Sequence, residues 1–446
     1  MSRKYKSRKK LPTEPVSIQI DSLSHEGRGV GRIEGKTVFV DGALPGETVE
    51  MQYLSQRGKF DEGRVTSIQV VSEQRVTPEC PYFGVCGGCS MQHLSSNAQI
   101  SHKQSILQEQ FTHFAQTQPQ EWLPPLQADL FHYRRKARLG VRHVMKKGRT
   151  LIGFREKYSN FLADIGHCPV LSKQISNLIV PMSQLIDGME TRFDIPQIEV
   201  SSGDNLVALI VRHLKPMPLT DQQKWQDFAK QHGVVVYLQP KGPDTVHRIW
   251  PENEADAQLS YQLDAFDVTL LQQPLDFAQV NASINRKMVP YAIDLLDVKP
   301  TDQVLDLFCG LGNFTLPLAT KAQYVVGVEG VAEMVERGKQ NALHNGLTNV
   351  DFYQADLTTD ISKAEWNQRQ YQKILIDPAR SGALEVIQNI VRLAAEKIVY
   401  VSCNPATLAR DAGELVKAGY QLKKAGVMDM FPQTTHVESI ALFEKN

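Results

Sequence analysis

The sequence predicts a multidomain α/β protein with three structured parts: a small N-terminal β-barrel, a mixed α+β central domain and a C-terminal doubly wound domain. Three observations predict this architecture. With 446 residues the chain is too long for one hydrophobic core. Residues 15–71 alternate short β-branched runs with glycine-rich turns, which indicates a small barrel. From about residue 277, runs typical of buried strands alternate with helical stretches, as in a parallel sheet covered by helices.

Composition and the first residues limit the class of protein further. Hydrophobic residues make up 42% and charged residues 22% of the chain, the balance of an ordinary soluble protein. No apolar run approaches the roughly 18 to 20 residues that cross a bilayer. Residues 1–4 begin no apolar signal segment. We therefore expect a cytoplasmic protein with no membrane partner, and a monomer in the absence of any interface pattern.

Basic residues are concentrated in two places although the formal net charge is zero. Residues 1–10 hold six basic residues and no acid, which predicts a disordered basic tail over residues 1–14 or a phosphate contact. Residues 134–157 hold ten basic residues and one acid. Screening limits charge interactions to roughly 8 to 10 Å, so local clusters can still bind phosphates. Aromatic residues near the second cluster could stack bases as well as pack against a sheet, which favours RNA contact there. They are Phe131, Tyr133 and Phe154.

The predicted barrel spans residues 15–72. Residues 17–20, 36–40 and 48–51 each have the β-branched content of a short strand, and glycines lie between them. The glycine-rich stretch HEGRGVGR, residues 25–32, resembles the signature of the TRAM domain, an OB-like RNA-binding barrel found on RNA-modifying enzymes. Another small barrel with a glycine-rich loop is the alternative.

The predicted central domain covers residues 73–276 and mixes helix with strand. Residues 96–118 carry apolar side chains at helical spacing without glycine or proline, so we expect a helix that can pack on the C-terminal domain. Three later runs suit strands: residues 197–200, 206–211 and 234–238.

The C-terminal domain is predicted to span residues 277–446 and to be Rossmann-like. A helical stretch, residues 331–345, lies between two of its strand candidates. Sheets of this kind bind ligands beyond the carboxyl ends of their strands, so functional residues are expected in the loops that follow. The five candidate strands are residues 303–307, 324–328, 350–353, 373–376 and 398–401.

The loop after the first of these strands has the sequence DLFCGLGNF, residues 306–314. Its glycines let the backbone turn tightly and approach a ligand closely. The loop lacks the GK[ST] of a phosphate-binding loop, and residue 315 is Thr where GxGxxG would need glycine. It instead resembles motif I of Rossmann-type methyltransferases, with Glu329 placed near the ribose hydroxyls and Asp356 near the adenine. S-adenosylmethionine is therefore the expected cofactor, and a dinucleotide is the alternative.

Cys403 directly follows the last candidate strand, in the sequence VSCNP. A lone cysteine is often only a small buried apolar residue, and Cys309 inside the cofactor loop is interpreted in this way. Cys403 lies at the predicted ligand-binding edge, with Asp377 after the preceding strand and Glu438 near the C-terminus. A thiol and a carboxylate can provide a nucleophile and a general base.

Together these stretches resemble the TrmA/RumA family of RNA uracil-5-methyltransferases. The matching stretches are FAQVN at 277–281, DLFCGLGNF at 306–314, DPAR at 377–380, SCNPAT at 402–407 and HVES at 436–439. The resemblance implies that Cys403 is the nucleophile that adds to carbon 6 of uracil and that Glu438 is the base that removes the carbon 5 proton. It also implies six residues that contact S-adenosylmethionine or line its pocket: Gln279, Phe308, Asn313, Glu329, Asp356 and Asp377.

Four further cysteines, Cys80, Cys86, Cys89 and Cys168, are expected to bind a metal centre, because a cytoplasmic protein rarely carries structural disulfides. Four thiolates suit tetrahedral zinc and a 4Fe-4S cluster equally. The sequence CPYFGVCGGC, residues 80–89, resembles the iron–sulfur segment of RumA-type enzymes. The resemblance therefore implies a structural 4Fe-4S cluster in the central domain.

The combination of modules sharpens the expected substrate. Within the family, the TrmA type acts on transfer RNA and lacks the barrel and the cluster, whereas the RumA type carries both and modifies large-subunit ribosomal RNA. The resemblance therefore implies 23S ribosomal RNA as the partner of this chain. Three alternatives stay open at this point: a transfer RNA substrate, methylation of cytosine, and a non-catalytic iron–sulfur RNA-binding protein.

Overall fold

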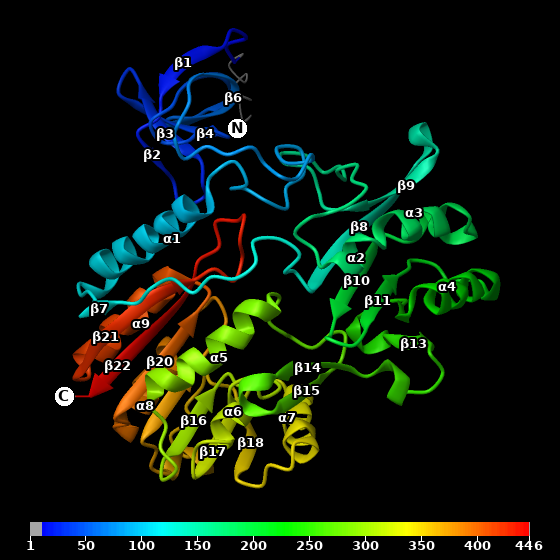
Figure 1. Cartoon of the computed structure of the whole chain (residues 1–446). Coiled ribbons are helices and arrows are strands. Elements are labelled where there is room, and N and C mark those ends of the chain that lie inside the picture. The colour runs from blue at the N-terminus through cyan, green and yellow to red at the C-terminus, as the bar shows by residue number, and fades with distance from the viewer. Residues whose placement is uncertain (1–10, 446) are drawn as a thin grey trace, which may run out of the picture. The chain divides into compact units, whose positions relative to one another are not determined.

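The structure is a computed structural model that describes residues 11–445 (Figure 1). The basic run of residues 1–10 lies outside this range. The described residues divide into two compact units, one of residues 11–102 with 433–435 and one of residues 103–432 with 436–445. Among the described residues, no helix combines the length and the apolar character needed to cross a membrane.

The first unit contains a six-stranded sheet in the order β1-β5-β6-β4-β3-β2. Strands β4 and β6 pair in parallel, and the other neighbours are antiparallel. At Gly31, in the glycine-rich stretch, a Cβ atom would lie 2.2 Å from the carbonyl oxygen of Gln19, so only glycine allows this close approach. The three predicted strands are confirmed. The strands are β1 (Val16–Gln19), β2 (Ser22–Leu23), β3 (Gly29–Ile33), β4 (Lys36–Asp41), β5 (Thr48–Gln56) and β6 (Phe60–Val70).

The second unit contains a central six-stranded sheet in the order β13-β12-β11-β10-β8-β9. Helix α4 (Leu219–His232) links β11 to β12, the one parallel pair in this sheet. Helices α2 (Lys173–Ser176) and α3 (Ile179–Asp187) precede β10, and the hairpin β14 (Leu259–Leu263) and β15 (Val268–Gln272) follows β13. The strands of the sheet are β8 (Lys136–Val144), β9 (Arg149–Gly153), β10 (Gln197–Ser202), β11 (Val207–Arg212), β12 (Val234–Gln239) and β13 (His247–Trp250).

An eight-stranded sheet in the order β18-β17-β16-β19-β20-β22-β21-β7 forms the rest of this unit. Strands β16 to β20 are parallel, while β22 is antiparallel to both of its neighbours. All five predicted strands and the helix predicted for residues 331–345 are confirmed. The strands are β7 (Glu121–Trp122), β16 (Gln303–Leu307), β17 (Tyr324–Glu329), β18 (Val350–Gln354), β19 (Lys373–Ile376), β20 (Lys397–Ser402), β21 (Tyr420–Met428) and β22 (Glu438–Lys445). The helices are α5 (Ala282–Leu296), α6 (Thr315–Ala319), α7 (Ala332–His344), α8 (Leu384–Ile390) and α9 (Pro405–Lys417).

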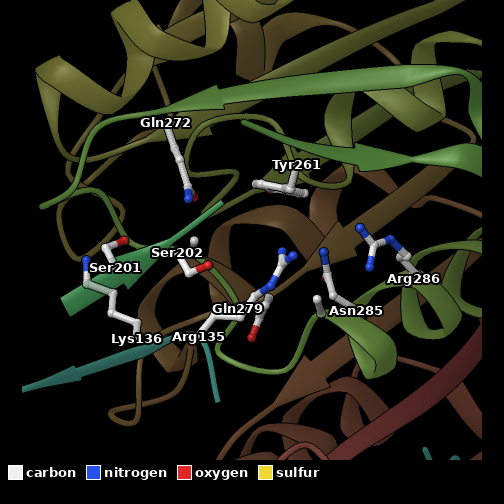
Figure 2. A pocket seen from close by; sticks show the side chains of 11 residues that line it. Arg135, Lys136, Ser201, Ser202, Tyr261, Gln272, Gln279, Asn285 and Arg286 are labelled. Atoms are coloured by element: carbon white, nitrogen blue, oxygen red, sulfur yellow. The ribbon is translucent and has the colours of Figure 1, made fainter. Parts of the chain in front are cut away.

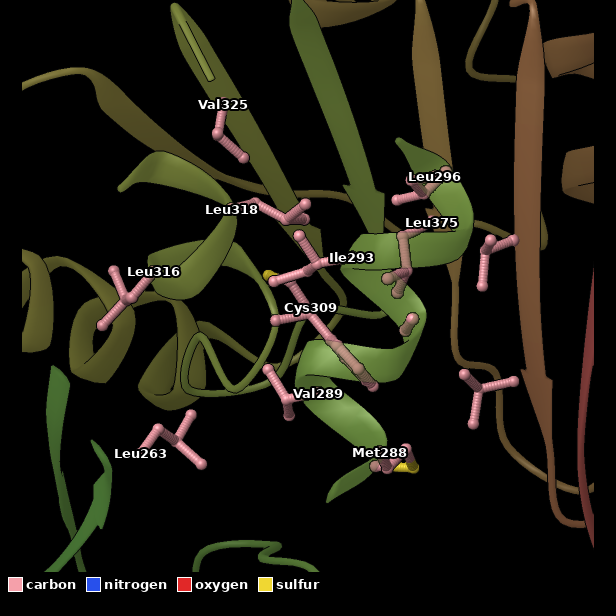
Figure 3. Close-up of a cluster of buried hydrophobic side chains, with 14 of the residues drawn as sticks. Leu263, Met288, Val289, Ile293, Leu296, Cys309, Leu316, Leu318, Val325 and Leu375 are labelled. Atoms are coloured by element: carbon pink, nitrogen blue, oxygen red, sulfur yellow. The ribbon is translucent and has the colours of Figure 1, made fainter. Parts of the chain in front are cut away.

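Helices cover both faces of this sheet. Apolar residues of α5 such as Ile293 belong to one buried cluster with Leu375 of β19 and Val399 of β20 (Figure 3). Successive strand residues point to opposite faces, and Tyr400 accordingly reaches the other side, where its hydroxyl lies 2.7 Å from Asp411 of α9. The strand order reverses between β16 and β19, and the loops at this reversal are where such sheets bind ligands.

The helix predicted for residues 96–118 is shorter than expected. Helix α1 spans Ser96–Gln110 and continues as a π-helical turn, η1 (Phe111–Ala115). It ends at Gln116, whose left-handed φ of 51° breaks the helix. The chain then extends to pair β7 in parallel with β21, so residues 116–118 cannot remain helical.

Candidate active site

The cofactor loop leaves the sheet after β16. Its two glycines have positive φ, 55° at Gly310 and 101° at Gly312, a conformation that glycine adopts without strain. The backbone N–H of Gly310 donates to Glu329 Oε2 (3.1 Å), and that of Val331 donates to Oε1 (3.0 Å). Glu329 therefore joins the ends of β16 and β17. Phe308 lies in the same loop, half-buried, with a φ of 63°.

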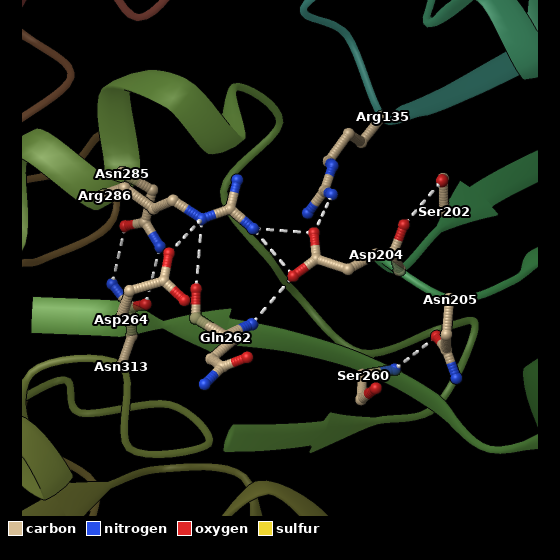
Figure 4. Close-up of polar contacts among 11 residues, drawn as sticks. Arg135, Ser202, Asp204, Asn205, Ser260, Gln262, Asp264, Asn285, Arg286 and Asn313 are labelled. Carbon is tan, nitrogen blue, oxygen red and sulfur yellow. Dashed lines mark hydrogen bonds and ion pairs between the residues drawn. The ribbon is translucent and has the colours of Figure 1, made fainter. Parts of the chain in front are cut away.

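Asn313 is held by protein groups on both ends of its amide. Its Oδ1 accepts from Asn285 Nδ2 (2.9 Å), and its Nδ2 donates to Asn285 Oδ1 (2.9 Å) (Figure 4). The same Oδ1 also accepts from the Tyr261 hydroxyl (3.0 Å). The side chain predicted to contact the cofactor thus first fixes the loop to α5 and to β14. Tyr261 and Asn285 are functional residues that sequence reasoning missed, because nothing links them to Asn313 in the sequence.

Gln279 lines a hollow beside the hydrogen bonds that join Asn313 to Tyr261 and Asn285. Side chains of the central sheet, of β14 and of α5 surround it (Figure 2). Its lining includes Arg135, Lys136, Ser202, Tyr261, Asn285 and Arg286. The hollow brings Gln279, from the segment before α5, next to the residues that hold the cofactor loop.

Three carboxylates lie close together at the reversal point of the sheet. Asp306 is fully buried; its Oδ2 accepts from the Thr315 hydroxyl (2.6 Å), while its Oδ1 has no hydrogen-bond partner among the described residues. Burial raises the pKa of Asp306 to about 8, and the charges of Asp377 and Glu329 add to this. Burial alone raises the pKa of Asp377 to about 7. Buried carboxylates favour a bound cation, so the group fits the sulfonium and ammonium of S-adenosylmethionine.

The sequence did not point to Asp306 as a site residue, although Asp306 is the first residue of the cofactor loop sequence, residues 306–314. Asp356, which was selected, is exposed just beyond β18, where its Oδ1 accepts from the N–H (2.9 Å) and hydroxyl (2.6 Å) of Thr358. These bonds lower the pKa of Asp356. Its other oxygen, Oδ2, is in none of these bonds.

The strand pairing brings Cys403 and Glu438 together. Strand β22 runs antiparallel to β20 with Ser402 opposite Ser439. Continuing this register by one residue puts Cys403 opposite Glu438, and opposed residues have Cβ atoms about 4.5 to 5.5 Å apart. Asn404 begins α9 by accepting from the N–H of Ala406 (3.1 Å), which fixes the backbone after the thiol.

Charge and burial raise the pKa of both groups. Burial raises the pKa of Glu438 well above its ordinary value, and the charge of Asp377 adds to this. Burial also raises the pKa of the Cys403 thiol, as do the charges of Glu438 and Asp377. Arg380 opposes both shifts; its Nη2 lies 3.3 Å from His436 Nδ1. Perturbed groups gathered at a ligand-binding edge are typical of an active site.

Two models of protein families match this sequence. Residues 95–446 match the model described as tRNA (Uracil-5-)-methyltransferase, and residues 11–52 match the TRAM domain. The chain belongs to the tRNA (uracil-5-)-methyltransferase family. Its fold prediction is confirmed for the N-terminal TRAM domain and for the methyltransferase domain.

Several relatives match this family member over their whole length. A curated relative from Alcanivorax borkumensis, named 23S rRNA (uracil(1939)-C(5))-methyltransferase RlmD, is 54% identical over 438 residues, 98% of each chain. A relative of the same name from Hahella chejuensis is 50% identical over 449 residues, covering 100% of both chains. The crystal structure of Pyrococcus abyssi tRNA (uracil-54, C5)-methyltransferase with S-adenosyl-L-homocysteine has the same fold. Its TM-score is 0.73 at 24% identity, covering 96% of this chain and 100% of that one.

The four cysteines expected to bind a cluster are divided between the units. Cys80, Cys86 and Cys89 lie in the first, and Cys168 lies in the second. The backbone N–H of Cys86 donates to the carbonyl of Tyr82 (2.9 Å), and that of Gly88 donates to Cys86 Sγ (3.4 Å), so the loop is a series of tight turns. Within residues 11–445, no three His, Cys, Asp or Glu side chains converge closely enough to hold a metal ion.

One aromatic residue expected to be able to stack RNA bases packs inside the protein. Tyr133 is 4% exposed, and its hydroxyl donates to the carbonyl of Pro432 (2.9 Å). Phe131 and Phe154 are half-buried. Of the two roles that the sequence left open for Tyr133, the structure shows packing, because this side chain anchors the segment before β8 to the loop after β21.

Proposed function

We propose that this chain transfers a methyl group from S-adenosylmethionine to carbon 5 of one uridine in 23S ribosomal RNA, the nucleotide that its relatives' names give as uracil 1939. The observation that supports this most directly is the register of β20 and β22, which, continued by one residue beyond Ser402 and Ser439, opposes the Cys403 thiol and the Glu438 carboxyl. Both lie near Asp377, one of the buried carboxylates that suit a sulfonium cofactor.

Cys403 and Glu438 carry the covalent steps in this proposal. The Cys403 thiolate forms a bond to carbon 6 of uracil, and the displaced electron pair makes carbon 5 nucleophilic. Bound S-adenosylmethionine supplies the methyl group that carbon 5 attacks. Glu438, as the carboxylate, then removes the carbon 5 proton, the bond between carbon 6 and sulfur breaks, and the thiolate is restored. Arg380 favours the thiolate throughout.

The remaining cofactor contacts follow from the positions of the predicted residues. Glu329 would accept hydrogen bonds from the ribose, and Asp356 would offer its Oδ2 to the adenine amine. Asp377 would face the methionine end or the uracil. Phe308, Gln279 and Asn313 would shape the pocket, with Asn313 acting through the loop that it holds.

Fluorinated RNA tests the covalent chemistry. Because fluorine at carbon 5 cannot leave as a proton, 5-fluorouridine RNA should trap the protein as a methylated covalent complex that survives denaturation. RNA carrying 5-fluorocytidine should not, which separates uracil from cytosine methylation. Cys403→Ala should form no complex. Glu438→Gln should accumulate the adduct on ordinary uridine RNA, because its proton is not removed. Full methylation by Cys403→Ala would overturn the mechanism.

The substrate is tested by labelling. Purified 23S ribosomal RNA and transfer RNA from a strain lacking the enzyme are incubated with the protein and S-adenosylmethionine labelled in its methyl group. We expect label in 23S ribosomal RNA alone. Label confined to transfer RNA would overturn the ribosomal assignment, while leaving the uracil chemistry intact.

A 4Fe-4S cluster held by Cys80, Cys86, Cys89 and Cys168 is a further part of the proposal. Four thiolate donors in a reducing compartment suit this cluster, and three of them lie within one tight loop. The cluster would stabilise the fold of residues 73–276, the proposed central domain, and position it for RNA. Anaerobically purified protein should contain four iron atoms per chain, and Cys168→Ser should lose them. One zinc atom in place of iron would overturn the assignment.

A further inference from the structure

The segment that follows β9, residues 154–162, presents two large aromatic side chains to solvent. Tyr158 is 61% exposed and Phe161 is 65% exposed. Aromatic side chains usually contribute their large apolar area to a core or an interface. Neither residue belongs to the methyltransferase sheet or to the cofactor loop. A role for these two rings must therefore lie at the surface.

The turn that carries them is internally braced. The N–H of Glu156 donates to the carbonyl of Phe161 (2.9 Å), which closes the turn. The Ser159 hydroxyl donates to Glu156 Oε2 (2.8 Å) and accepts from the N–H of Phe161 (3.0 Å). An isolated antiparallel β-bridge pairs Arg155 with Leu162, near the two ends of the turn. The turn is thus a fixed support, which reduces the ordering cost of any ligand that binds it.

Tyr158 adopts a backbone conformation that glycine would take more easily. Its φ is +61°, in the left-handed region where a bulky side chain is strained. Strain of this kind persists where the surrounding structure imposes it, and it is concentrated at positions that contact ligands. The position therefore keeps a ring that local backbone preference disfavours.

Basic residues are frequent in the sequence in and around the turn. Between residues 145 and 164 the chain carries five basic residues and two acids. Glu156 is used inside the turn, and Asp164 pairs with Lys147 (2.6 Å) and Arg149 (2.6 Å). The stretch also carries Lys146, Arg155 and Lys157, so basic residues outnumber acidic ones. Exposed rings beside excess positive charge are the combination that binds single-stranded nucleic acid, by base stacking and phosphate contact.

We infer that residues 154–162 form a stacking platform for unpaired bases of the RNA substrate, with Tyr158 and Phe161 as the stacking rings. The inference rests on the proposed function, because it takes the ligand to be the same RNA that is methylated. A folded protein would place apolar side chains against these rings, whereas unpaired bases match both the rings and the charge.

Substitutions at the two rings test the platform in the full-length enzyme. Tyr158→Gly and Phe161→Ala should each raise the Kd for transcribed 23S ribosomal RNA by about tenfold, the size of one lost base stack. Their kcat and their Kd for S-adenosylmethionine should equal those of the parent. Because glycine relaxes the backbone at position 158, Tyr158→Gly should not lower the melting temperature.

Conservative variants and a matched control make the test specific. Tyr158→Phe keeps the ring and should bind RNA as the parent does, whereas Phe161→Leu keeps only apolar bulk and should behave like Phe161→Ala. Leu219→Ala, at an 81% exposed position that begins α4, should change nothing. A parental Kd for both Tyr158→Gly and Phe161→Ala would overturn the inference, and so would full rescue by Phe161→Leu, which would indicate a protein-docking surface. Failure of the proposed function would appear differently, as a parent enzyme that does not methylate 23S ribosomal RNA.

Discussion

At the scale of single residues, two buried carboxyl groups make the cofactor pocket sensitive to pH. Asp306 and Asp377 have pKa values of about 8 and about 7 in the protein without ligand, so both hold protons near neutral pH. A cationic cofactor stabilises their ionised forms and lowers both pKa values. Binding must therefore release protons, and we expect the affinity for S-adenosylmethionine to rise as the pH increases through about 7 to 8.

Calorimetry checks this pH dependence directly. Titrations in buffers of different ionisation enthalpy should give a proton release that disappears above about pH 9, where both groups are already ionised. S-adenosylhomocysteine lacks the sulfonium charge and should show a weaker dependence. A pH-independent affinity without proton release would contradict the electrostatic account of the pocket.

Among single residues, those that follow strands could be predicted and those that act through distant contacts could not. Cys403, Asp377 and Glu329 were expected in the site because they follow or end predicted parallel strands, where ligands bind, and their positions at the ends of β20, β19 and β17 agree with that expectation. Asp306 was overlooked because its importance depends on a buried oxygen without a partner, which no sequence pattern reveals.

At the scale of elements, the two hydrogen bonds between the side-chain amides of Asn313 and Asn285 connect the cofactor loop to α5. We expect Asn285→Ala to raise the Kd for S-adenosylmethionine by about tenfold, because it leaves the half-buried amide of Asn313 without two of its hydrogen bonds. The Kd for RNA should stay near that of the parent. Asn205→Ala is the matched control, since its amide bonds the backbone of β14 at Ser260 without reaching the cofactor loop. Equal effects of both variants on cofactor affinity would contradict the role of the Asn285–Asn313 hydrogen bonds in holding the cofactor loop.

A buried ion pair supports the segment that leads to Glu438. Lys103 Nζ donates to Asp429 Oδ1 (2.7 Å) and to the carbonyl of Phe431 (3.0 Å), and both charged side chains are almost fully buried. Removing one partner leaves an uncompensated charge, so Lys103→Met should lower the free energy of unfolding by about 3 to 5 kcal/mol. The double variant Lys103→Met with Asp429→Leu should lose less, because no charge remains.

Denaturant titration measures this difference. Lys417→Met is the control, because Lys417 is exposed and pairs with Glu414 only at the surface (2.6 Å), where such pairs contribute about 0 to 1 kcal/mol. A double variant less stable than Lys103→Met would show that the pair is not coupled in this way.

The bounds of strands and helices show which elements the local sequence could predict. Strands β16 and β19 were predicted to the residue, because parallel strands buried on both faces appear as uninterrupted apolar runs. The end of the helix beginning at Ser96 was misplaced, because pairing of β7 with β21 joins segments some 300 residues apart. Strand pairing over such distances overrides local helix preference.

At the scale of the whole molecule, zero net charge limits long-range attraction to RNA. RNA affinity must then come from local basic clusters, and the Kd should rise with salt by about 0.7 logarithmic units per decade for each phosphate contact on a single strand. We expect Arg155→Gln and Lys157→Gln each to reduce this slope by about one contact. Lys230→Gln, on the exposed side of α4, is the matched control and should leave the slope unchanged. Binding titrations over a range of potassium chloride concentrations measure all four proteins. An identical slope for all of them would mean that the charge beside the aromatic turn does not contact RNA phosphates.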